Sequence, residues 1–262
     1  MHIKHLLPVS ALLVLAACNK PEGCMDPLAL NYDPEAEVDK GCTYAESYPM
    51  SMHFHSSLNG VDLVEEQQYT INGVNTNIEL VQFYVSGIAL INANGDTINS
   101  DTYLLVKPET DEYSIGDFPP GDYTKLIFHV GVDSITNHSD PSVYDLKDPL
   151  SAQSPSMHWG WSFGYIFLRI DGEVDSDGDG TPDPAGTFEM HTGEDRYLTT
   201  VEIDYPITIG NGQENILHLD ANWDLFFAGV DMANDNTVHG SDNLPLAEIL
   251  FENLPGIFSA EE

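Results

Sequence analysis

Histidine side chains are the first candidates for chemistry in this chain, which has ten of them. His53 and His55 lie two positions apart in a stretch that reads as a strand, so both side chains should point to the same side. Such a pair predicts a metal site with His53 and His55 as ligands. His138 and His239 stand alone, and isolated histidines are more often ordinary surface residues.

The second candidate is the segment 157–172, Met-His-Trp-Gly-Trp-Ser-Phe-Gly-Tyr-Ile-Phe-Leu-Arg-Ile-Asp-Gly, which holds two of the three tryptophans. As a strand, it would place Met157, Trp159 and Trp161 on one face. His158 would take the other face. Thioether and imidazole groups without thiolates suit copper better than calcium or magnesium. The alternative is an aromatic strand that fills a core or offers a sugar-stacking surface.

Residues 175–183 read Asp-Ser-Asp-Gly-Asp-Gly-Thr-Pro-Asp and predict a calcium-binding loop. Carboxylates recur at every second position, and Gly180 stands where such a loop turns sharply. The expected ligands are the side chains of Asp175, Asp177, Asp179 and Asp183 and the carbonyl of Thr181. Gly186 replaces the last glutamate of an EF-hand, so the loop is closer to thrombospondin-type and dockerin-type loops. A solvated acidic turn is the alternative.

The first part of the chain has the features of an exported lipoprotein. A short apolar run ends in Leu-Ala-Ala-Cys, which predicts a signal peptide over residues 1–17 and lipidation of Cys18. Cys24 and Cys42 remain as an even pair and predict a disulfide in an oxidising compartment. No cysteine is then left for a thiolate zinc site or a blue-copper centre. We expect a lipid-anchored extracytoplasmic protein, periplasmic or at the outer-membrane surface.

The acidic composition excludes some classes of function. A formal net charge of -35 with only eight basic residues argues against nucleic-acid binding, which needs a cationic surface. We expect contact with a membrane through the lipid anchor only. The sequence signatures of serine hydrolases, zinc proteases, P-loop proteins and dinucleotide-binding proteins are missing. We therefore expect a protein that is not an enzyme, with a glycoside hydrolase that uses paired carboxylates as the catalytic alternative.

Runs of alternating polar and apolar residues predict an all-β domain over residues 48–262. The expected strands are 51–57, 78–90, 103–107, 124–132, 163–170, 198–203, 216–219 and 225–230, with turns at 94–96, 119–122 and 211–212. Pro245, after possible caps at Asp242 and Asn243, predicts a late helix that ends before Pro255-Gly256. We predict an antiparallel β-sandwich or barrel with one short C-terminal helix, preceded by a disulfide-stapled module over residues 18–47.

Several segments resemble the MbnP family of secreted copper-binding proteins, which are encoded beside a di-haem MauG-like peroxidase. The main one is Met-x-Trp-x-Trp from Met157, followed by Gly-Tyr and then Asp-Gly. The others fall in family order: Val-Ser-Gly-Ile-Ala-Leu at 85–90, Gly-Val-Asp-Ser at 131–134, Asp-Pro-Leu at 148–150 and Phe-Glu-Met-His-Thr-Gly at 188–193. The resemblance extends over residues 50–258.

The resemblance implies extracytoplasmic copper binding and metal homeostasis. It implies His55 and His191 as copper ligands, with His53, Met157 and His158 as further candidates. It also implies that Trp159 or Trp161 is oxidised to kynurenine by a di-haem MauG-like cytochrome c peroxidase, and that copper binding depends on this change. The alternative function is a calcium-stabilised surface binding or adhesion module without copper chemistry.

Overall fold

The computed structural model describes residues 20–25, 29–43, 46–110, 112–160, 163–210 and 213–261. The chain divides into two compact units, residues 1–46 and 47–262. The predicted signal peptide, the predicted lipidation site Cys18 and the predicted turn at 211–212 lie outside the described residues. Among the described residues, no helix is long and apolar enough to cross a membrane.

The first unit is a small module closed by a disulfide. Strands β1 (Glu22–Gly23) and β2 (Val38–Asp39) pair in parallel within it. Cys24 and Cys42 are bonded, which confirms the predicted pair. The disulfide compensates for a unit that buries little apolar surface.

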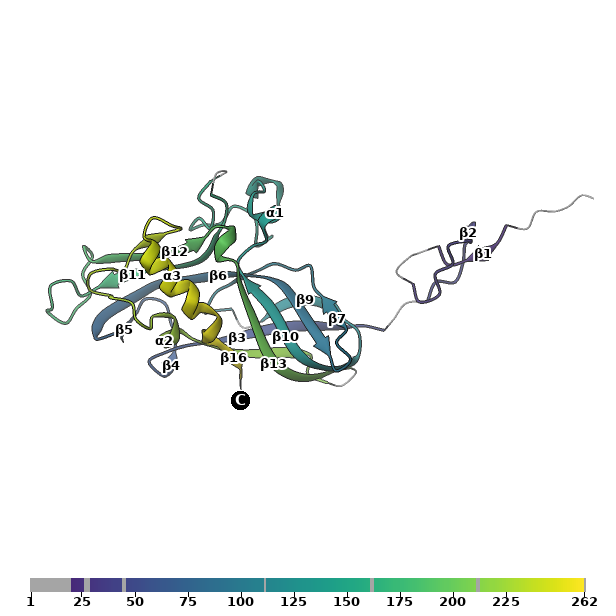
Figure 1. The fold of residues 1–262 in the computed structure, drawn as a ribbon, viewed down its shortest axis with the longest axis horizontal. Helices are drawn as coiled ribbons and strands as arrows, with labels where there is room; N and C mark the ends of the chain where they lie inside the picture. The colour runs from purple at the N-terminus through teal and green to yellow at the C-terminus, as the bar shows by residue number, and fades with distance from the viewer. Residues whose placement is uncertain are drawn as a thin grey trace, which may run out of the picture. The chain divides into compact units, whose positions relative to one another are not determined.

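The second unit contains two β-sheets, which Figure 1 shows as long strands. The nine-stranded sheet has the order β13-β10-β6-β11-β12-β15, and β5, β7 and β8 also pair with β6. Its strands are β5 (Gln67–Ile71), β6 (Val74–Asn92), β7 (Thr97–Asn99), β8 (Leu104–Val106), β10 (Gly121–Val130), β11 (Ile166–Val174), β12 (Thr187–Gly193), β13 (Thr199–Ile209) and β15 (Val238–His239). The five-stranded sheet has the order β16-β14-β3-β4, and β9 also pairs with β3. Its strands are β3 (Tyr48–Leu58), β4 (Val61–Asp62), β9 (Tyr113–Phe118), β14 (Ile216–Asn222) and β16 (Phe258–Ala260).

The two sheets enclose the main hydrophobic core, and of the predicted sandwich or barrel the structure is a sandwich. Phe54 of β3 makes edge contacts with Phe83 of β6 and Phe128 of β10, at ring-centroid distances of 5.7 and 6.1 Å. Alternation along β3 buries Met50, Met52 and Phe54 while the intervening side chains face outward. Most strand pairs are antiparallel, but β14 pairs with β3 and β12 with β15 in parallel.

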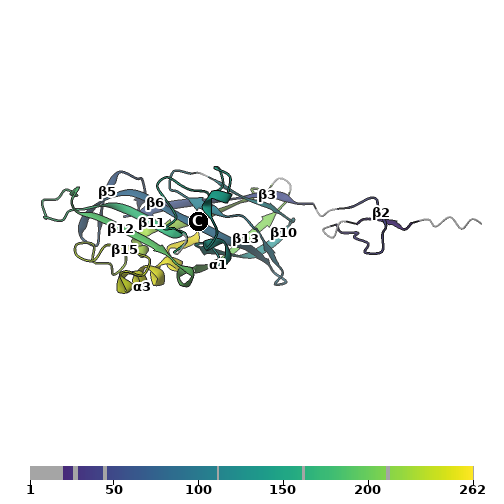
Figure 2. The same ribbon diagram turned by 90° about the horizontal axis from the view of Figure 1, so that it is seen from above.

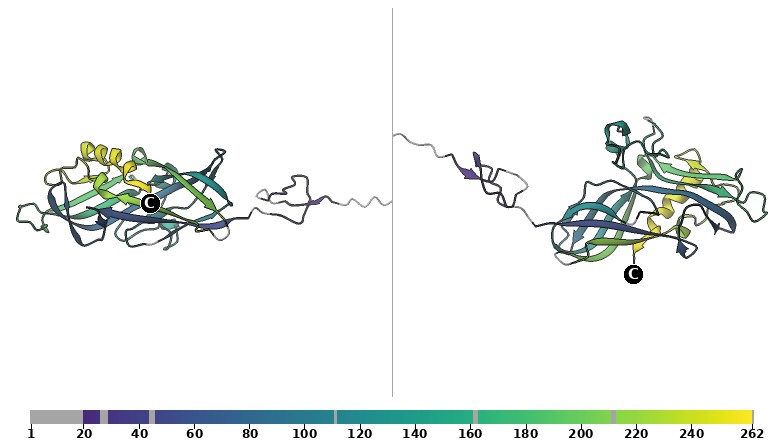
Figure 3. Two further views of the ribbon diagram at one scale, coloured as in Figure 1. Left: turned by 90° about the horizontal axis from the view of Figure 1, so that it is seen from below. Right: turned by 180° about the vertical axis from the view of Figure 1, so that it is seen from behind.

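Helices are short and lie outside the strand layers. They are α1 (Ser134–Asn137), α2 (Trp223–Phe226), α3 (Leu244–Asn253) and the 3-10 turns η1 (Pro141–Val143), η2 (Asp195–Tyr197) and η3 (Leu254–Ile257). Figures 2 and 3 show α3 along the outside of the strands, and it confirms the predicted C-terminal helix with Asn243 as its cap. The predicted strand at 225–230 is wrong. The Asn222 side chain accepts the Asp224 N–H and starts the helical turn α2, which buries Trp223 and Phe226.

Candidate metal centre

The tryptophan segment is a hairpin and not the single strand expected from the sequence. Trp159 N–H donates to the Gly164 carbonyl at 2.9 Å, and Ile166 N–H donates to the Met157 carbonyl at 2.9 Å. The chain reverses because Gly160 and Gly164 take positive φ angles of 110° and 76°, which glycine adopts without strain. Strand β11 begins only at Ile166, so Met157 and Trp159 are not part of this strand. Trp161 lies outside the described residues.

Asn137 fixes the base of this hairpin. Its side-chain oxygen accepts the Tyr165 N–H at 2.7 Å, and its amide nitrogen donates to Asp195 Oδ1 at 2.8 Å. The side chain is fully buried, so both hydrogen bonds are shielded from water. Gly164 leaves the space that Asn137 needs, since a Cβ there would lie 2.3 Å from Asn137 Oδ1. The hairpin therefore has a defined position on the end of the nine-stranded sheet.

A cluster of metal-ligand side chains forms where β12 meets β15. His191 and His239 are direct partners in the parallel ladder, and their ring centroids are 4.8 Å apart. Glu189 lies two residues before His191 and thus on the same face of β12, with Oε2 at 2.8 Å from Nε2 of His239. One ligand atom from each of these three residues lies within 4.8 Å of the others. We call Glu189, His191 and His239 the β12–β15 cluster.

Asp171 of the neighbouring strand β11 orients His191. Its Oδ1 lies 2.5 Å from Nε2 of His191, and its Oδ2 pairs with Arg169 at 2.6 Å. Burial would raise the pKa of Asp171, but hydrogen bonds from His191 and Arg169 outweigh burial and lower it. An ionised carboxylate only accepts, so Nε2 of His191 carries the proton and Nδ1 keeps a lone pair in the neutral ring. Metal-binding histidines commonly have this carboxylate partner.

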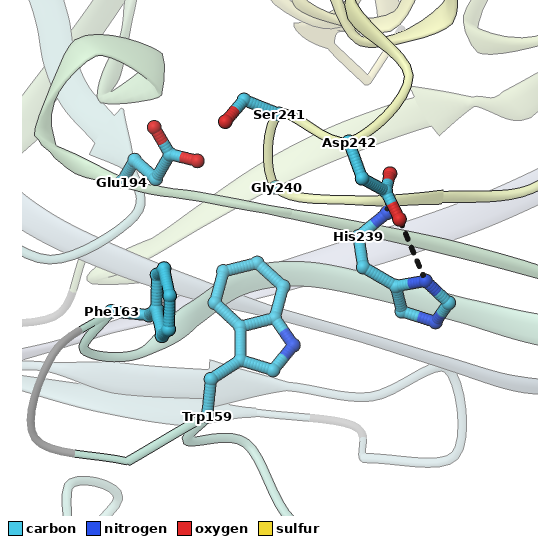
Figure 4. Close-up of a pocket in the computed structure, with 7 residues that line it drawn as sticks. All are labelled: Trp159, Phe163, Glu194, His239, Gly240, Ser241 and Asp242. Carbon is cyan, nitrogen blue, oxygen red and sulfur yellow. Dashed lines mark hydrogen bonds and ion pairs between the residues drawn. The ribbon is translucent and has the colours of Figure 1, made fainter.

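The indole of Trp159 lies beside the cluster and lines a cavity of about 470 Å³. The cavity is bounded by Trp159, Phe163, Glu194, His239, Gly240, Ser241 and Asp242. In Figure 4 the Trp159 ring lies between Phe163 and His239, with its indole nitrogen on the side of His239. His239 has 37% side-chain exposure, and its Nδ1 atom lies 3.4 Å from Oδ2 of Asp242. His191 is buried. The cluster is therefore reached from solvent by way of His239 and the indole.

The structure does not bring His55 and His191 together, which corrects the expected joint site. His55 lies on β3 of the five-stranded sheet, and His191 lies on β12 of the other sheet. Their neighbours Phe54 and Met190 point into the common core, so the two histidines point to opposite outer faces. His55 instead contacts Asp62 and Asp220, each at 3.0 Å. Hydrogen bonds from the His55 ring to these two carboxylates, first to Asp62 and then to Asp220, raise the pKa of His55.

The remaining predicted copper ligands are not members of the β12–β15 cluster. His53 is on the same outer face as His55, and its ring centroid lies 5.6 Å from that of His218. Met157 is buried in a small hydrophobic cluster with Tyr84 and Tyr165. His158 uses Nδ1 to accept the N–H of Gly160 at 2.9 Å, and burial lowers its pKa. His158 thus stabilises the hairpin turn.

The predicted calcium loop connects β11 to β12. Carboxylate oxygens of Asp175, Asp177 and Asp183 lie within 4.8 Å of one another. Asp175 also accepts backbone N–H groups from Gly178 and Gly180, at 2.7 and 2.9 Å. The other two expected ligands, Asp179 and Thr181, follow in the same loop, where the Thr181 N–H donates to Asp179 Oδ1 at 2.8 Å. The loop closes the hairpin whose strands carry Asp171 and His191.

Sequence reasoning missed two of the three residues of the cluster. Glu189 could have been found, because it alternates with His191 along a strand and must share its face. His239 gave no such signal, since β15 has only two residues and its parallel pairing with β12 is a tertiary contact.

The fold and this cluster define a β-sandwich with two imidazoles and a carboxylate beside a solvent-accessible tryptophan. The sequence model of the MbnP family matches residues 47–240, a range that contains the β12–β15 cluster and Trp159. The chain belongs to the MbnP family. Its fold is similar to that of MbnP from Methylosinus trichosporium, with a TM-score of 0.56 and 17% identity over 79% of this chain and 88% of that chain. No match was found among curated protein sequences. Membership in this family suggests a methanobactin-related, copper-associated protein.

Proposed function

We propose that this protein binds one copper ion through Glu189, His191 and His239, beside Trp159. The observation that carries the proposal is the β12–β15 cluster, whose three ligand atoms lie within 4.8 Å of one another. Two of the residues implied by the family resemblance, His191 and Trp159, meet there although they are 32 positions apart in the sequence. The role proposed is binding and not catalysis.

The donor set fits copper. Two imidazoles and one carboxylate without a thiolate suit copper or zinc, and for a given set of such ligands copper(II) binds more tightly than zinc. Asp171 fixes the ring of His191 before the ion arrives, which lowers the entropy cost of binding. A bound copper ion would replace the 2.8 Å contact between His239 and Glu189 by bonds to both.

We further propose that Trp159 is the residue converted to kynurenine by a di-haem peroxidase of the MauG type. In this conversion two equivalents of hydrogen peroxide cleave the C2–C3 bond of the indole, which places one oxygen atom on each carbon and releases two water molecules. Hydrolysis of the bond between C2 and the ring nitrogen then releases C2 as formate and leaves the amine and the ketone. The peroxide consumed by the haem partner is the oxidant, and the product is an aryl amine and a ketone. Trp159 is half-buried beside the cavity, whereas Trp223 is fully buried in the main core. A partner can therefore reach Trp159 but not Trp223.

Two proposals concern the setting of the site. Lipidation at Cys18 would hold the protein outside the cytoplasm, where the Cys24–Cys42 disulfide is stable. Calcium bound by the loop 175–183 would stiffen the β11–β12 hairpin that carries Asp171 and His191. The calcium proposal is supported by the spacing of the carboxylates in the sequence and by the convergence of Asp175, Asp177 and Asp183 in the structure.

A copper titration of site variants tests the main proposal. His191→Ala and His239→Ala should each weaken copper binding by more than about tenfold, since each removes one of three ligands. His138→Ala is the control, because this exposed histidine near the same end of the sheet pairs with Asp195 and is not in the cluster. Copper binding by the His191→Ala/His239→Ala double variant with unchanged affinity and stoichiometry would refute the site.

Intact mass tests the proposed modification separately. Protein co-produced with its own di-haem partner should show the mass change of kynurenine, and Trp159→Phe should abolish it. Trp161→Phe and Trp223→Phe should leave the change in place. A mass change that persists in Trp159→Phe would transfer the modification to another tryptophan, and an unchanged mass in the wild-type protein would refute the maturation.

A further inference from the structure

We propose a second metal site for a divalent transition-metal ion of the zinc type, formed by His53, His218 and Glu261. It lies on the outer face of the five-stranded sheet, away from the β12–β15 cluster, and does not depend on the proposed copper function. One ligand atom from each of the three residues lies within 4.8 Å of the others.

Strand register brings the two histidines together. In the parallel ladder between β3 and β14, His53 and His218 are direct partners. Neighbouring strands are about 4.8 Å apart, so partner side chains on one face stand side by side. The two imidazole ring centroids are 5.6 Å apart with a tilt of 54° between the rings. This is the separation at which two imidazoles can turn toward one ion between them.

Glu261 completes the cluster from the segment that follows β16. Its backbone N–H donates to the carbonyl of His218 at 3.1 Å, which fixes the chain beside β14. Its Oε2 atom lies 3.6 Å from Nδ1 of His218. Glu214 offers another carboxylate oxygen, 3.6 Å from Nε2 of the same histidine. Strands β3 and β14 and the segment after β16 thus contribute to one small area of the surface.

His55 lies on the same face, and its ligand atom lies within 4.8 Å of those of Asp220 and Glu261, so Glu261 is shared between two groups of possible ligands. Both ring nitrogens of His55 are held by carboxylates, Nδ1 by Asp220 and Nε2 by Asp62. These carboxylates, together with Glu214 and Glu261, make the face negative and favour a cation. We assign the ion to His53 and His218 because this pair supplies two imidazoles together with Glu261, whereas the group around His55 supplies one.

The chemistry of the donors selects the class of metal. Imidazole nitrogen suits zinc and copper, whereas calcium and magnesium prefer sites made of oxygen alone. Two imidazoles and a carboxylate match a zinc site that keeps an open position for water. Zinc–nitrogen bonds of about 2.0–2.1 Å require the side chains to turn inward from their present separation. His218 and Glu261 have side-chain exposures of 38% and 36%, so they have the freedom to turn.

An ion at this site would connect β3, β14 and the segment after β16. Such a connection exists only in the folded protein, so zinc should raise the melting temperature by mass action. The expected effect is structural and has a readout that is independent of copper.

The test uses zinc chloride and the full-length His191→Ala/His239→Ala variant, which lacks the proposed copper ligands. Excess calcium is present to occupy sites made only of carboxylates. This protein should bind one zinc ion by calorimetry, and its melting temperature should rise. Adding His53→Gln or His218→Gln should each abolish the rise and weaken zinc binding by at least tenfold, and Glu261→Gln should weaken it less. Adding His138→Ala instead should change neither measurement.

The outcomes separate this site from the copper site. Absence of zinc binding in the His191→Ala/His239→Ala variant would overturn the second site and leave the copper proposal untouched. Unchanged zinc affinity after His53→Gln and His218→Gln would also overturn it. Circular dichroism checks that each variant is folded, and Glu261→Gln is a conservative change that keeps the proposal testable if a histidine variant does not fold.

Discussion

The six-membered ring of Trp159 lies directly against the backbone of Gly193, the last residue of β12. A Cβ atom at Gly193 would be 2.5 Å from Cζ3 of the indole and 2.7 Å from the carbonyl oxygen of Tyr165. Gly193 lies two residues after His191, so the same short segment supplies a metal-ligand side chain and the surface on which the indole rests. The segment 188–193 therefore supplies a metal-ligand side chain and also supports the indole. The second role requires a residue without a Cβ atom at position 193.

Gly193→Ala should displace the indole and weaken copper binding. The new methyl group would overlap the ring and the Tyr165 carbonyl, and overpacking of this kind costs about 1–3 kcal/mol. Tryptophan fluorescence and a copper titration measure the two effects. Gly256→Ala is the control, since no atom lies within 4 Å of a Cβ at that position. Wild-type copper affinity in Gly193→Ala would show that the indole position does not matter for the site.

Asp171→Asn should weaken copper binding by about 10–100-fold, the usual effect of losing a carboxylate partner of a metal-binding histidine. The neutral amide no longer fixes the proton of His191 on Nε2. Glu173→Gln is the matched control, because Glu173 lies two residues along the same face of β11. Equal copper affinities of the two variants would contradict the orienting role of Asp171.

Asn137→Ala should destabilise the domain by about 1–3 kcal/mol, the cost of leaving a buried donor without its acceptor. The donor left alone is the Tyr165 N–H at the base of the tryptophan hairpin. Urea unfolding measures the change. Asn99→Ala, an exposed position on β7, should stay within about 0.5 kcal/mol of the wild type. A similar small effect at Asn137 would mean that the hairpin does not need this anchor.

Much of the fold could be predicted because its strands alternate. Burial along β3 alternates at nearly every residue, and the same pattern in the sequence predicts a strand with one face in a core. The aromatic residues of the tryptophan hairpin favour strands, so the sequence predicts a strand there. In the structure Gly160 and Gly164 have positive φ angles, and the chain reverses between them. The range 225–230 predicts a strand, whereas α2 is a helical turn, because a short run of apolar residues fits a buried strand and a buried helical turn equally well.

The site was only partly predictable, for a different reason. His191 and Trp159 were selected by resemblance to a family, and the structure brings them to one place. His239 joins them through a two-residue strand that pairs in parallel with β12, and no local pattern announces such a pairing. The same resemblance implies His55 for this site, but it does not say on which side of a sandwich an outward-facing residue lies, and the structure puts His55 on the other sheet.

Asp133 should make stability depend on acid pH. Its carboxylate caps α1 by accepting the N–H groups of Ile135 and Thr136, and it also accepts the hydroxyl of Tyr103. Burial alone would raise the pKa of Asp133, but these hydrogen bonds lower it below its ordinary value. A lowered pKa gives stability above the value of an unfolded aspartate, about 3.9, and this stability is lost as the pH falls through the folded value.

Asp133→Asn is the variant that tests this, because the amide oxygen can still cap α1 but does not titrate. Urea unfolding of the wild type and the variant between about pH 6 and pH 2 compares their pH dependence. The wild type should be the more stable above about pH 4, and the difference should shrink as the pH falls. Parallel curves for the two proteins would show that Asp133 contributes nothing to acid unfolding.

Removing calcium should loosen the loop 175–183 and, with it, the hairpin that carries Asp171 and His191. An ion bound only by the folded state stabilises it by mass action, so excess chelator should lower the melting temperature of protein purified with calcium present. Asp177→Asn should lower it in the same way and should make it insensitive to chelator, since Asp177 is one of the three carboxylates that converge. Asp145→Asn changes an exposed acid outside the loop and should respond to chelator like the wild type.

Copper affinity measured with and without calcium extends the test to the site, and a modest loss without calcium is expected because the strands that hold Asp171 and His191 would be less rigid. A melting temperature that chelator does not change, in protein shown by elemental analysis to contain calcium, would refute the role of the loop.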